Sequence, residues 1–227
     1  YYIDLLEDAV KYKLMLNFHG ATIPRGWQRT YPHMMSVEGV YGAEWYNNTP
    51  VLTNRAAEHN ATLPFTRNVV GPMDYTPGTF SDSQHPHITS YGHELALPII
   101  FESALQHMPD RPSVYYDMPE PVKKLLSDLP VAWDDTKLLA GYPGMEVVMA
   151  RRKGDVWYIA GINGTNKPRT LCFLLKDLSV VGKKITLFED GIYDRSFTIA
   201  EDLPLSEDEM SVEIKCLPRG GFVAVIK

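Results

Sequence analysis

The sequence predicts a mixed fold, with an α/β part over residues 1–130 followed by an all-β part over residues 131–227. Two observations predict this division. All seven histidines and thirteen of the 17 prolines precede residue 131, so the composition changes near Leu129–Pro130. After that point, short runs of β-branched and aromatic residues alternate with turn residues, which is typical of antiparallel strands. The length of 227 residues suffices for one or two domains with cores of their own.

In the first part, helices and strands alternate along the chain. Residues 1–13 carry apolar side chains at helical spacing, and the apolar run 14–18 follows and ends at His19-Gly20. A helix, a short buried strand and a polar turn in this order are typical of a parallel sheet. The further elements expected are short strands at 37–40 and 69–74, a long helix over 90–108 that bends at Pro98, and a short helix over 121–129.

The second part is expected to form an antiparallel β-sandwich. Turn sequences such as Asn163-Gly164 and Asp190-Gly191 separate its strands at a spacing of roughly 8–12 residues. No histidine occurs there, so a supporting role is predicted for this part. The expected strands cover residues 146–152, 155–162, 169–175, 184–188, 196–200, 211–216 and 221–227.

Composition excludes several classes of function. The chain has 22 Lys and Arg against 28 Asp and Glu, a net charge of -6, whereas proteins that bind nucleic acid through its phosphates usually carry a basic excess. No apolar run approaches the ~20 residues of a membrane span. Neither a nucleic-acid partner nor a membrane span is therefore expected. Cys172 and Cys216 are too far apart for a CxxC motif and are either buried thiols or one disulfide.

Polar residues follow the predicted strands of the first part, and Glu38 and Glu44 are the pair of greatest interest among them. A fully extended chain would hold these two residues ~20 Å apart, and a continuous helix would point them in different directions. Glycines at positions 39 and 42 allow the backbone to turn, so that both carboxylates can face one site and share a hard cation such as Ca²⁺. The alternative is two solvated glutamates on a loop, which the spacing alone favours.

Three further residues each have two interpretations. Arg29 lies between aromatic residues, which suits a sugar or carboxylate site, but a structural ion pair is as good an explanation. His19 follows an apolar strand, where a histidine taken alone is more often structural than catalytic. Asp74 lies between Pro72 and Tyr75, where it either belongs to the site or caps a turn.

Two long runs in the first part form ordered motifs. The first contains NFHGAT at 17–22, PRGWQRTYP at 24–32 and SVEGVYGAEW at 36–45, and the second contains LPFTR at 63–67 and GPMDYTPG at 71–78. Both resemble the catalytic core of glycoside hydrolase family 97, which comprises bacterial, Ca²⁺-dependent α-glycosidases. These enzymes have an N-terminal β-sandwich, a (β/α)₈ barrel and a C-terminal β-sandwich. The resemblance thus implies that residues 1–130 are the C-terminal half of the barrel and residues 131–227 the C-terminal β-sandwich.

The resemblance also implies roles for single residues. Glu44 would be the catalytic proton donor to the leaving glycosidic oxygen, and Glu38 would be a Ca²⁺ ligand, with Glu44 near or on the same ion. His19 and Arg29 would lie at the sugar subsite. Inverting members of the family carry a glutamate base directly after the histidine, whereas this chain has Gly20 there. That difference matches the retaining branch, which uses an aspartate nucleophile on the preceding barrel strand and reacts by double displacement.

That strand is expected upstream of residue 1, together with the first half of the barrel and the N-terminal β-sandwich. The expected function is therefore part of a retaining, exo-acting α-glycosidase that cleaves terminal α-galactosides, or α-glucosides, from oligosaccharides. The resemblance implies a periplasmic or secreted location, and the 227 residues alone are expected to be inactive. The alternative is a non-catalytic carbohydrate-binding or structural protein that retains the scaffold, which the missing nucleophile strand would favour.

Overall fold

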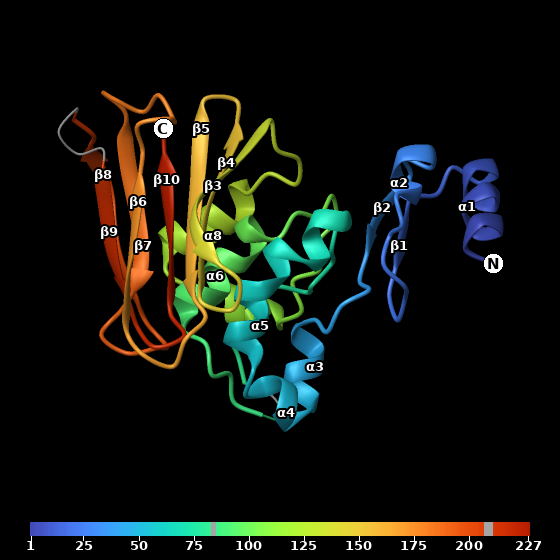
Figure 1. The fold of residues 1–227 in the computed structure, drawn as a ribbon, viewed down its shortest axis with the longest axis horizontal. Helices are drawn as coiled ribbons and strands as arrows, with labels where there is room; N and C mark the ends of the chain where they lie inside the picture. Colours follow the sequence, from blue (N-terminus) through green and yellow to red (C-terminus); the bar gives the residue numbers. More distant parts are fainter. Residues whose placement is uncertain (83–84, 207–210) are drawn as a thin grey trace.

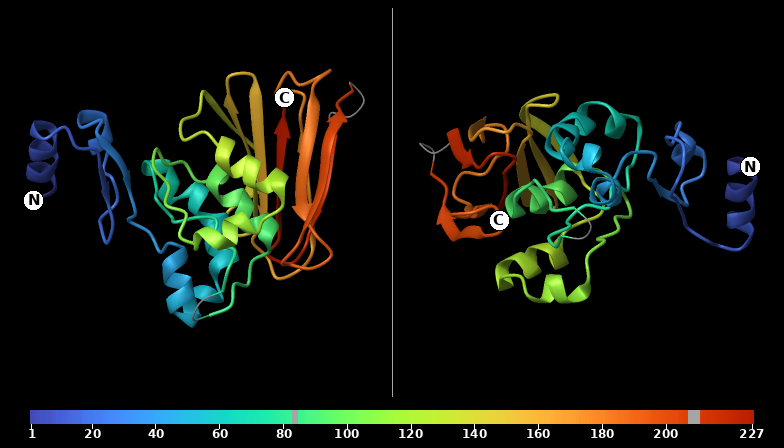
Figure 2. Two further views of the ribbon diagram at one scale, coloured as in Figure 1. Left: turned by 180° about the vertical axis from the view of Figure 1, so that it is seen from behind. Right: turned by 90° about the horizontal axis from the view of Figure 1, so that it is seen from below.

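The computed structural model describes residues 1–82, 85–206 and 211–227, with the backbone alone at residues 46 and 47. Three parts follow one another in space as they do along the chain (Figure 1): a small N-terminal unit, a group of helices and a β-rich part. Views from behind and from below show the same separation of the N-terminal unit from the β-rich part (Figure 2). Among the described residues, no helix combines the length and the apolar character needed to cross a membrane.

The N-terminal unit pairs two short strands in parallel. Leu6 of the first helix packs against Met34 and Val37 in a small core of its own. The strand expected at 37–40 lies three residues earlier, so the sequence after Val37 forms the turn that follows the strand. The elements are α1 (Tyr2–Lys11), β1 (Leu16–Phe18), α2 (Trp27–Thr30) and β2 (Met34–Val37), and the parallel pair is β1 with β2.

The middle part is helical, and its central helix is α6 (Tyr91–Ile100). The expectation of a helix over 90–108 is wrong in its second half, because the helix ends at Ile100, shortly after Pro98. Proline has no amide hydrogen to continue the helical hydrogen bonds, and the Gln106 side chain donates to the Pro98 carbonyl as the chain folds back. The other elements are α3 (Ala43–Asn48), α4 (Pro50–Thr53), α5 (Ala56–Thr62), η1 (Leu63–Phe65), η2 (Arg67–Val70), α7 (Pro112–Tyr116) and α8 (Glu120–Asp128).

The strand expected at 69–74 is also wrong. The 3₁₀ turn η2 is followed by a segment without regular secondary structure. Arg67 explains the difference, because its guanidinium donates to the Pro72 carbonyl, which is then not available to a neighbouring strand. The segment still runs to the end of β2, where the Asp74 amide donates to the carbonyl of Val37.

The β-rich part is antiparallel throughout, as predicted, and contains one strand more than expected. The described strands are β3 (Asp135–Tyr142), β4 (Glu146–Lys153), β5 (Val156–Asn163), β6 (Arg169–Leu174), β7 (Lys184–Asp190), β8 (Phe197–Pro204), β9 (Ser211–Cys216) and β10 (Gly221–Ile226). Six of them form one sheet in the order β3-β4-β5-β10-β7-β8, and β6 pairs with β9 in a second. The additional strand is β3, at the edge of its sheet, and its side chains are half-buried or exposed, which leaves only a weak apolar pattern in the sequence.

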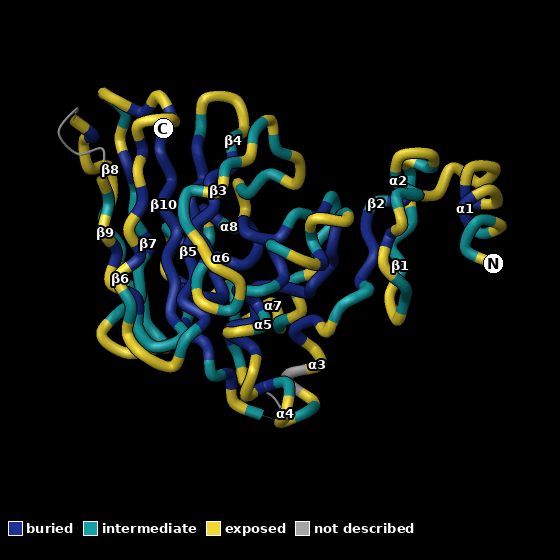
Figure 3. The backbone as a smooth tube through the Cα atoms, viewed as in Figure 1, coloured by how far each residue is buried: buried dark blue, intermediate teal, exposed yellow. Residues whose placement is uncertain are grey.

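Both faces of the six-stranded sheet are covered, and its central strands β5 and β10 are buried (Figure 3). On one face, a core that includes the stacked rings of Phe173 and Phe222 joins the sheet to β6 and β9. On the other face, a core that includes Leu95 and Val223 joins the sheet to α6. This second core draws residues from both sides of Leu129–Pro130, so the two parts stabilise each other. The domain boundary at that point, between α8 and β3, stays a prediction.

The two cysteines are free thiols, so the disulfide alternative is wrong. Cys172 lies on β6 and is exposed, whereas Cys216 lies on β9 and is buried. Burial, with smaller contributions from Asp190 and Glu189, raises the pKa of the Cys216 thiol well above its ordinary value. Because the thiolate is the reactive form, Cys216 is expected to be an unreactive core residue.

Candidate active site

Four segments that are distant in sequence meet beyond the carboxyl ends of β1 and β2. Because these strands are parallel, the turns that follow them lie at the same edge of the sheet, where α/β proteins place their sites. His19 follows β1 and Glu38 follows β2. The segment that carries Asp74 and the loop that carries His107 complete the group through direct hydrogen bonds.

The structure brings Glu38 and Glu44 together. One carboxylate oxygen of each and a ring nitrogen of His19 all lie within 4.8 Å of one another. The turn depends on Gly39, whose φ of +45° lies in the left-handed region and whose added Cβ would meet the Thr22 carbonyl oxygen at 2.9 Å. Since Glu38 is buried, a pair of solvated loop glutamates does not describe this arrangement.

A backbone hydrogen bond fixes the Glu38 carboxylate. The Gly20 amide donates to Glu38 Oε2 at 2.5 Å, and His19 Nδ1 lies 3.9 Å from the same oxygen. Gly20 has a φ of +60°, which other residues rarely adopt. Gly20 occupies the position at which inverting relatives are expected to carry their base. In this chain its backbone amide instead donates a hydrogen bond that holds the Glu38 carboxylate.

The two glutamates fit a hard cation. Partial burial raises the pKa of Glu44, and the neighbouring Glu38 carboxylate raises it further, with a smaller opposing effect of His19. Two carboxylates that disfavour each other's charge are stabilised by a cation between them, and Ca²⁺ prefers carboxylate oxygens. Glu38 and Glu44 are therefore the residues that would hold Ca²⁺ here. A bound Ca²⁺ would act on the pKa of Glu44 in the opposite direction to Glu38.

A second polar cluster, centred on Asp74, adjoins the glutamates through His19. Asp74 is fully buried. Its Oδ2 accepts hydrogen bonds from Asn17 Nδ2 at 2.6 Å and from His19 Nε2 at 2.8 Å. His107 Nδ1 lies 2.5 Å from the same oxygen, and the His107 amide donates to Oδ1 at 3.0 Å. Asp74 therefore belongs to the site and is more than a turn cap.

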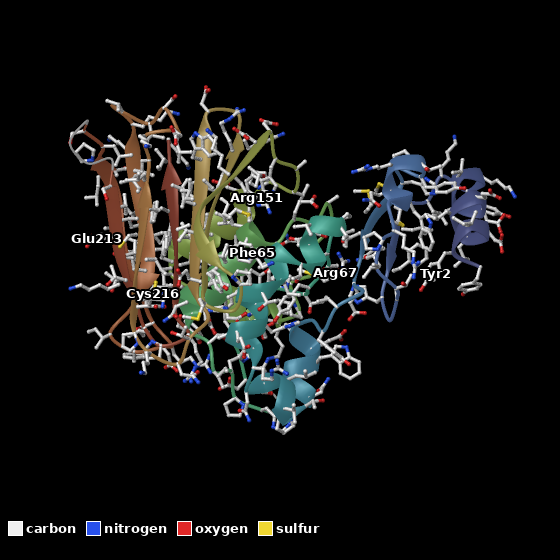
Figure 4. All side chains as sticks on the ribbon, in the orientation of Figure 1. Tyr2, Phe65, Arg67, Arg151, Glu213 and Cys216 are labelled. Carbon is white, nitrogen blue, oxygen red and sulfur yellow. The ribbon has the colours of Figure 1, made fainter. Side chains whose placement is uncertain are left out.

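Arg67 fixes the turn that carries Glu38. It lies where the N-terminal unit meets the helices (Figure 4) and is buried. Burial lowers the pKa of Arg67 to about 10, so the group stays protonated near neutral pH. Its nitrogens donate to five backbone carbonyls, those of Val37, Glu38, Gly39, Gly71 and Pro72. One side chain thus ties the end of β2 to the segment that leads to Asp74.

Arg29, which the family resemblance implies at the sugar subsite, lies on the exposed surface of α2. No described hydrogen bond joins Arg29 to His19, Glu38 or Glu44, so its role stays a prediction. Arg67 and His107 were not predicted from the sequence as residues of the site. Both lie in stretches without a strand pattern, and only the position of Arg67 inside the LPFTR motif could have indicated it.

A polar cavity of about 540 Å³ opens beside Glu44. It lies between α3, which carries Glu44, and the loops that carry Ser81 and Arg111. Glu44 therefore belongs to a group that could hold a cation and also borders an open polar space, an arrangement that suits a proton donor to a leaving group. The lining residues are Glu44, Asn48, Thr79, Ser81, Asp82, Pro109, Asp110 and Arg111.

Comparison with known proteins assigns the family. The family model described as glycoside hydrolase 97 matches residues 1–40, and the model described as glycosyl-hydrolase 97 C-terminal, oligomerisation, matches residues 132–227. The chain belongs to glycoside hydrolase family 97. The match at residues 1–40 includes His19 and Glu38, and the match at 132–227 covers the β-rich part.

Relatives in family 97 match the chain along most of its length. A protein named probable retaining alpha-galactosidase, from Streptomyces bingchenggensis, is 45% identical over 71% of this chain and 24% of its own length. The retaining alpha-galactosidase of Bacteroides thetaiotaomicron is 34% identical over 97% of this chain and 35% of its own length. A family 97 enzyme from Pseudoalteromonas sp. strain K8, solved in complex with panose, superposes with a TM-score of 0.87 at 29% identity and covers 100% of this chain and 36% of its own. The chain thus spans about a quarter to a third of these family 97 proteins.

Proposed function

We propose that this chain is the C-terminal part of a retaining, exo-acting α-glycosidase, with terminal α-galactosides as the leading substrates and α-glucosides second. The observation that carries the proposal is the pairing of Glu38 with Glu44 at 4.8 Å or less, next to an open polar cavity. The two curated relatives described above, both named retaining alpha-galactosidases, support the galactoside. Gly20 at the position of the inverting base supports retention.

In the proposed reaction, Glu44 donates its proton to the glycosidic oxygen as the bond to the sugar breaks. An aspartate from a preceding part of the longer protein attacks the anomeric carbon and forms a glycosyl-enzyme intermediate. Glu44 then accepts a proton from the water that hydrolyses the intermediate. Partial burial and Glu38 favour the protonated form of Glu44 that the first step needs.

The finer description of the fold belongs to the same proposal. Residues 1–130 would form the C-terminal half of a (β/α)₈ barrel, in which the parallel strands β1 and β2 pair with strands of the preceding half. Residues 131–227 would form the C-terminal β-sandwich. The parallel pairing of β1 with β2 and the exposure of Tyr12 and Met15 beside them support this, because the missing half would cover them. Assembly with that half and with an N-terminal β-sandwich, in a bacterial periplasmic or secreted protein, is part of the proposal.

Calcium supplies electrostatic stabilisation of the site when it is bound, and Glu38 and Glu44 would hold it. We therefore expect the complete protein to hydrolyse 4-nitrophenyl α-galactoside faster than the α-glucoside, to lose this activity to a chelator and to regain it with CaCl₂. Glu38→Gln should weaken calcium binding, measured by calorimetry on the chelator-treated protein, by about tenfold or more, because calcium affinity follows the charge of its ligands.

Glu58→Gln is the matched control, because Glu58 is exposed on α5. It should leave calcium affinity and hydrolysis as they are in the wild type. If the complete protein with calcium hydrolysed neither glycoside, the proposed function would be wrong. If Glu38→Gln and Glu58→Gln bound calcium equally well, Glu38 would not be a ligand.

A further inference from the structure

The Asp74 carboxylate accepts four hydrogen bonds, and the proposed chemistry gives it no role. It is completely buried, whereas the two histidines that contact it are accessible, with 35% of the His19 side chain and 57% of the His107 side chain exposed. Three side-chain nitrogens converge on its Oδ2 and a backbone amide binds its Oδ1. A buried carboxylate thus lies directly behind a pair of solvent-facing imidazoles.

The carboxylate of Asp74 is ionised. Burial alone would raise its pKa, but the hydrogen bonds from the His107 amide, the two imidazoles and Asn17 outweigh burial and hold the pKa below the ordinary value. An ionised carboxylate only accepts hydrogen bonds. The ring nitrogens that face it must therefore carry hydrogen, which places the proton of His19 on Nε2 and that of His107 on Nδ1.

The opposite nitrogen of each ring then has a free lone pair when the histidine is neutral. These nitrogens, Nδ1 of His19 and Nε2 of His107, lie on the side of each ring away from Asp74. Nδ1 of His19 is also the nitrogen that lies 3.9 Å from Glu38 Oε2, which is too far for a direct hydrogen bond. The rings stand edge to face with centroids 5.4 Å apart. Each neutral ring thus offers one hydrogen-bond acceptor, which suits a hydroxyl group of a sugar.

We propose that Asp74 is a positioning residue that fixes the ring orientation and tautomer of His19 and His107, so that His107 joins His19 in accepting hydrogen bonds from sugar hydroxyls. The substrate in this inference rests on the proposed function. The positioning by Asp74 does not.

A metal ion held by His19, Asp74 and His107 is the alternative that the donor set raises. The distances argue against it. Two ligands of one zinc ion, each about 2.0–2.1 Å from the metal at a tetrahedral angle, lie roughly 3.3 Å apart. Asp74 Oδ2 lies 2.8 Å from the His19 nitrogen and 2.5 Å from the His107 nitrogen, and these are lengths of hydrogen bonds.

The test is Asp74→Asn in the complete enzyme. The amide keeps the shape of the side chain, but its NH₂ group cannot accept the hydrogen bonds that Oδ2 accepts. Whichever way the amide turns, its NH₂ group faces at least one of the donors now bound to Asp74, and its neutral oxygen accepts more weakly than a carboxylate. The two imidazoles are then held less firmly in the ring orientation and tautomer that suit the sugar. We expect kcat/KM for the α-galactoside to fall roughly 10- to 100-fold, as for other residues whose hydrogen bonds orient a ligand-binding side chain. Most of the loss should be in kcat, because contacts to sugar hydroxyls strengthen in the transition state.

His107→Ala should lower kcat/KM by about tenfold, and the double variant Asp74→Asn, His107→Ala should lose less than the product of the two single effects. Nitrogen-15 NMR of the imidazoles in the unliganded enzyme gives a readout that does not depend on activity. The ring signals of His19 and His107, assigned by their loss in single alanine variants, should change in Asp74→Asn.

Asp190→Asn is the matched control for a structural effect. Asp190 also accepts several hydrogen bonds, including those of Ser90 and Leu217, but it lies at the junction of α6 with the sheet. The Asp190→Asn variant should have a lower melting temperature than the wild type, with unchanged imidazole signals and an unchanged kcat/KM of the folded enzyme. If Asp74→Asn behaved in the same way, the inference would be overturned. If the imidazole signals changed but the wild type hydrolysed no glycoside, the positioning would stand and the proposed function would fail.

Discussion

Glu44→Gln in the complete enzyme is expected to abolish hydrolysis of α-galactosides with poor leaving groups while sparing those with activated aryl leaving groups. A sugar alkoxide needs a proton as it departs, and glutamine has none to give, whereas dinitrophenolate leaves without help. General acid catalysis contributes about 10²- to 10⁴-fold. The loss in kcat/KM should thus be about 10³-fold for a galactosyl disaccharide and less than about tenfold for the dinitrophenyl galactoside.

Two features of the structure make this prediction specific to Glu44. Glu44 belongs to the group with His19 and Glu38 that could hold a cation, and it also lines the polar cavity, where the leaving group would lie. Since Glu44 is also a proposed calcium ligand, the kinetics are measured at saturating CaCl₂, with Glu58→Gln as the control. Equal losses on both kinds of leaving group would remove Glu44 from the role of acid.

Arg67→Met is expected to be the most damaging substitution for stability. Methionine fills part of the space but donates no hydrogen bond, so the buried carbonyls that Arg67 now satisfies would lose their partner. Each buried polar group left without a partner costs about 1–3 kcal/mol. Allowing for water entry, we expect a loss of about 3–5 kcal/mol and a melting temperature lower by about 5–10 °C. Calcium affinity should fall as well, because the turn that carries Glu38 loses its support.

Arg55→Met provides the comparison, since Arg55 is exposed just before α5. It should change the melting temperature by no more than about 1 °C, as is usual for surface substitutions. Arg67→Lys should fall between the two, because one ammonium group cannot reach all the carbonyls that the guanidinium reaches. A melting temperature for Arg67→Met equal to that of Arg55→Met would show that the five hydrogen bonds do not stabilise the turn.

The sequence predicted those parts of the fold in which the local pattern and the tertiary structure agree. The β-branched runs of β4, β5 and β10 are buried on both faces, so their apolar character was easy to identify. The edge strand β3 was missed because packing and pairing, rather than an apolar run, make it a strand. At 69–74, the valines indicated a strand, but the hydrogen bonds of Arg67 hold that segment in another conformation.

The site was predictable where its geometry is local. Glu38 and Glu44 are six positions apart, and the left-handed Gly39 between them is a local cause of their approach. Asp74 and His107 were not predictable in the same way. They are 33 residues apart in sequence and come together only because the chain folds back after α6. No spacing rule covers a contact of that kind.

The most direct test of the account is the stereochemistry of the first product released by the complete enzyme. Proton NMR during hydrolysis of an α-galactoside distinguishes the anomers before they interconvert. Gly20 stands where an inverting member is expected to carry its base, and Glu44 is the proposed acid, so we expect α-galactose to appear first. Initial release of β-galactose would contradict it.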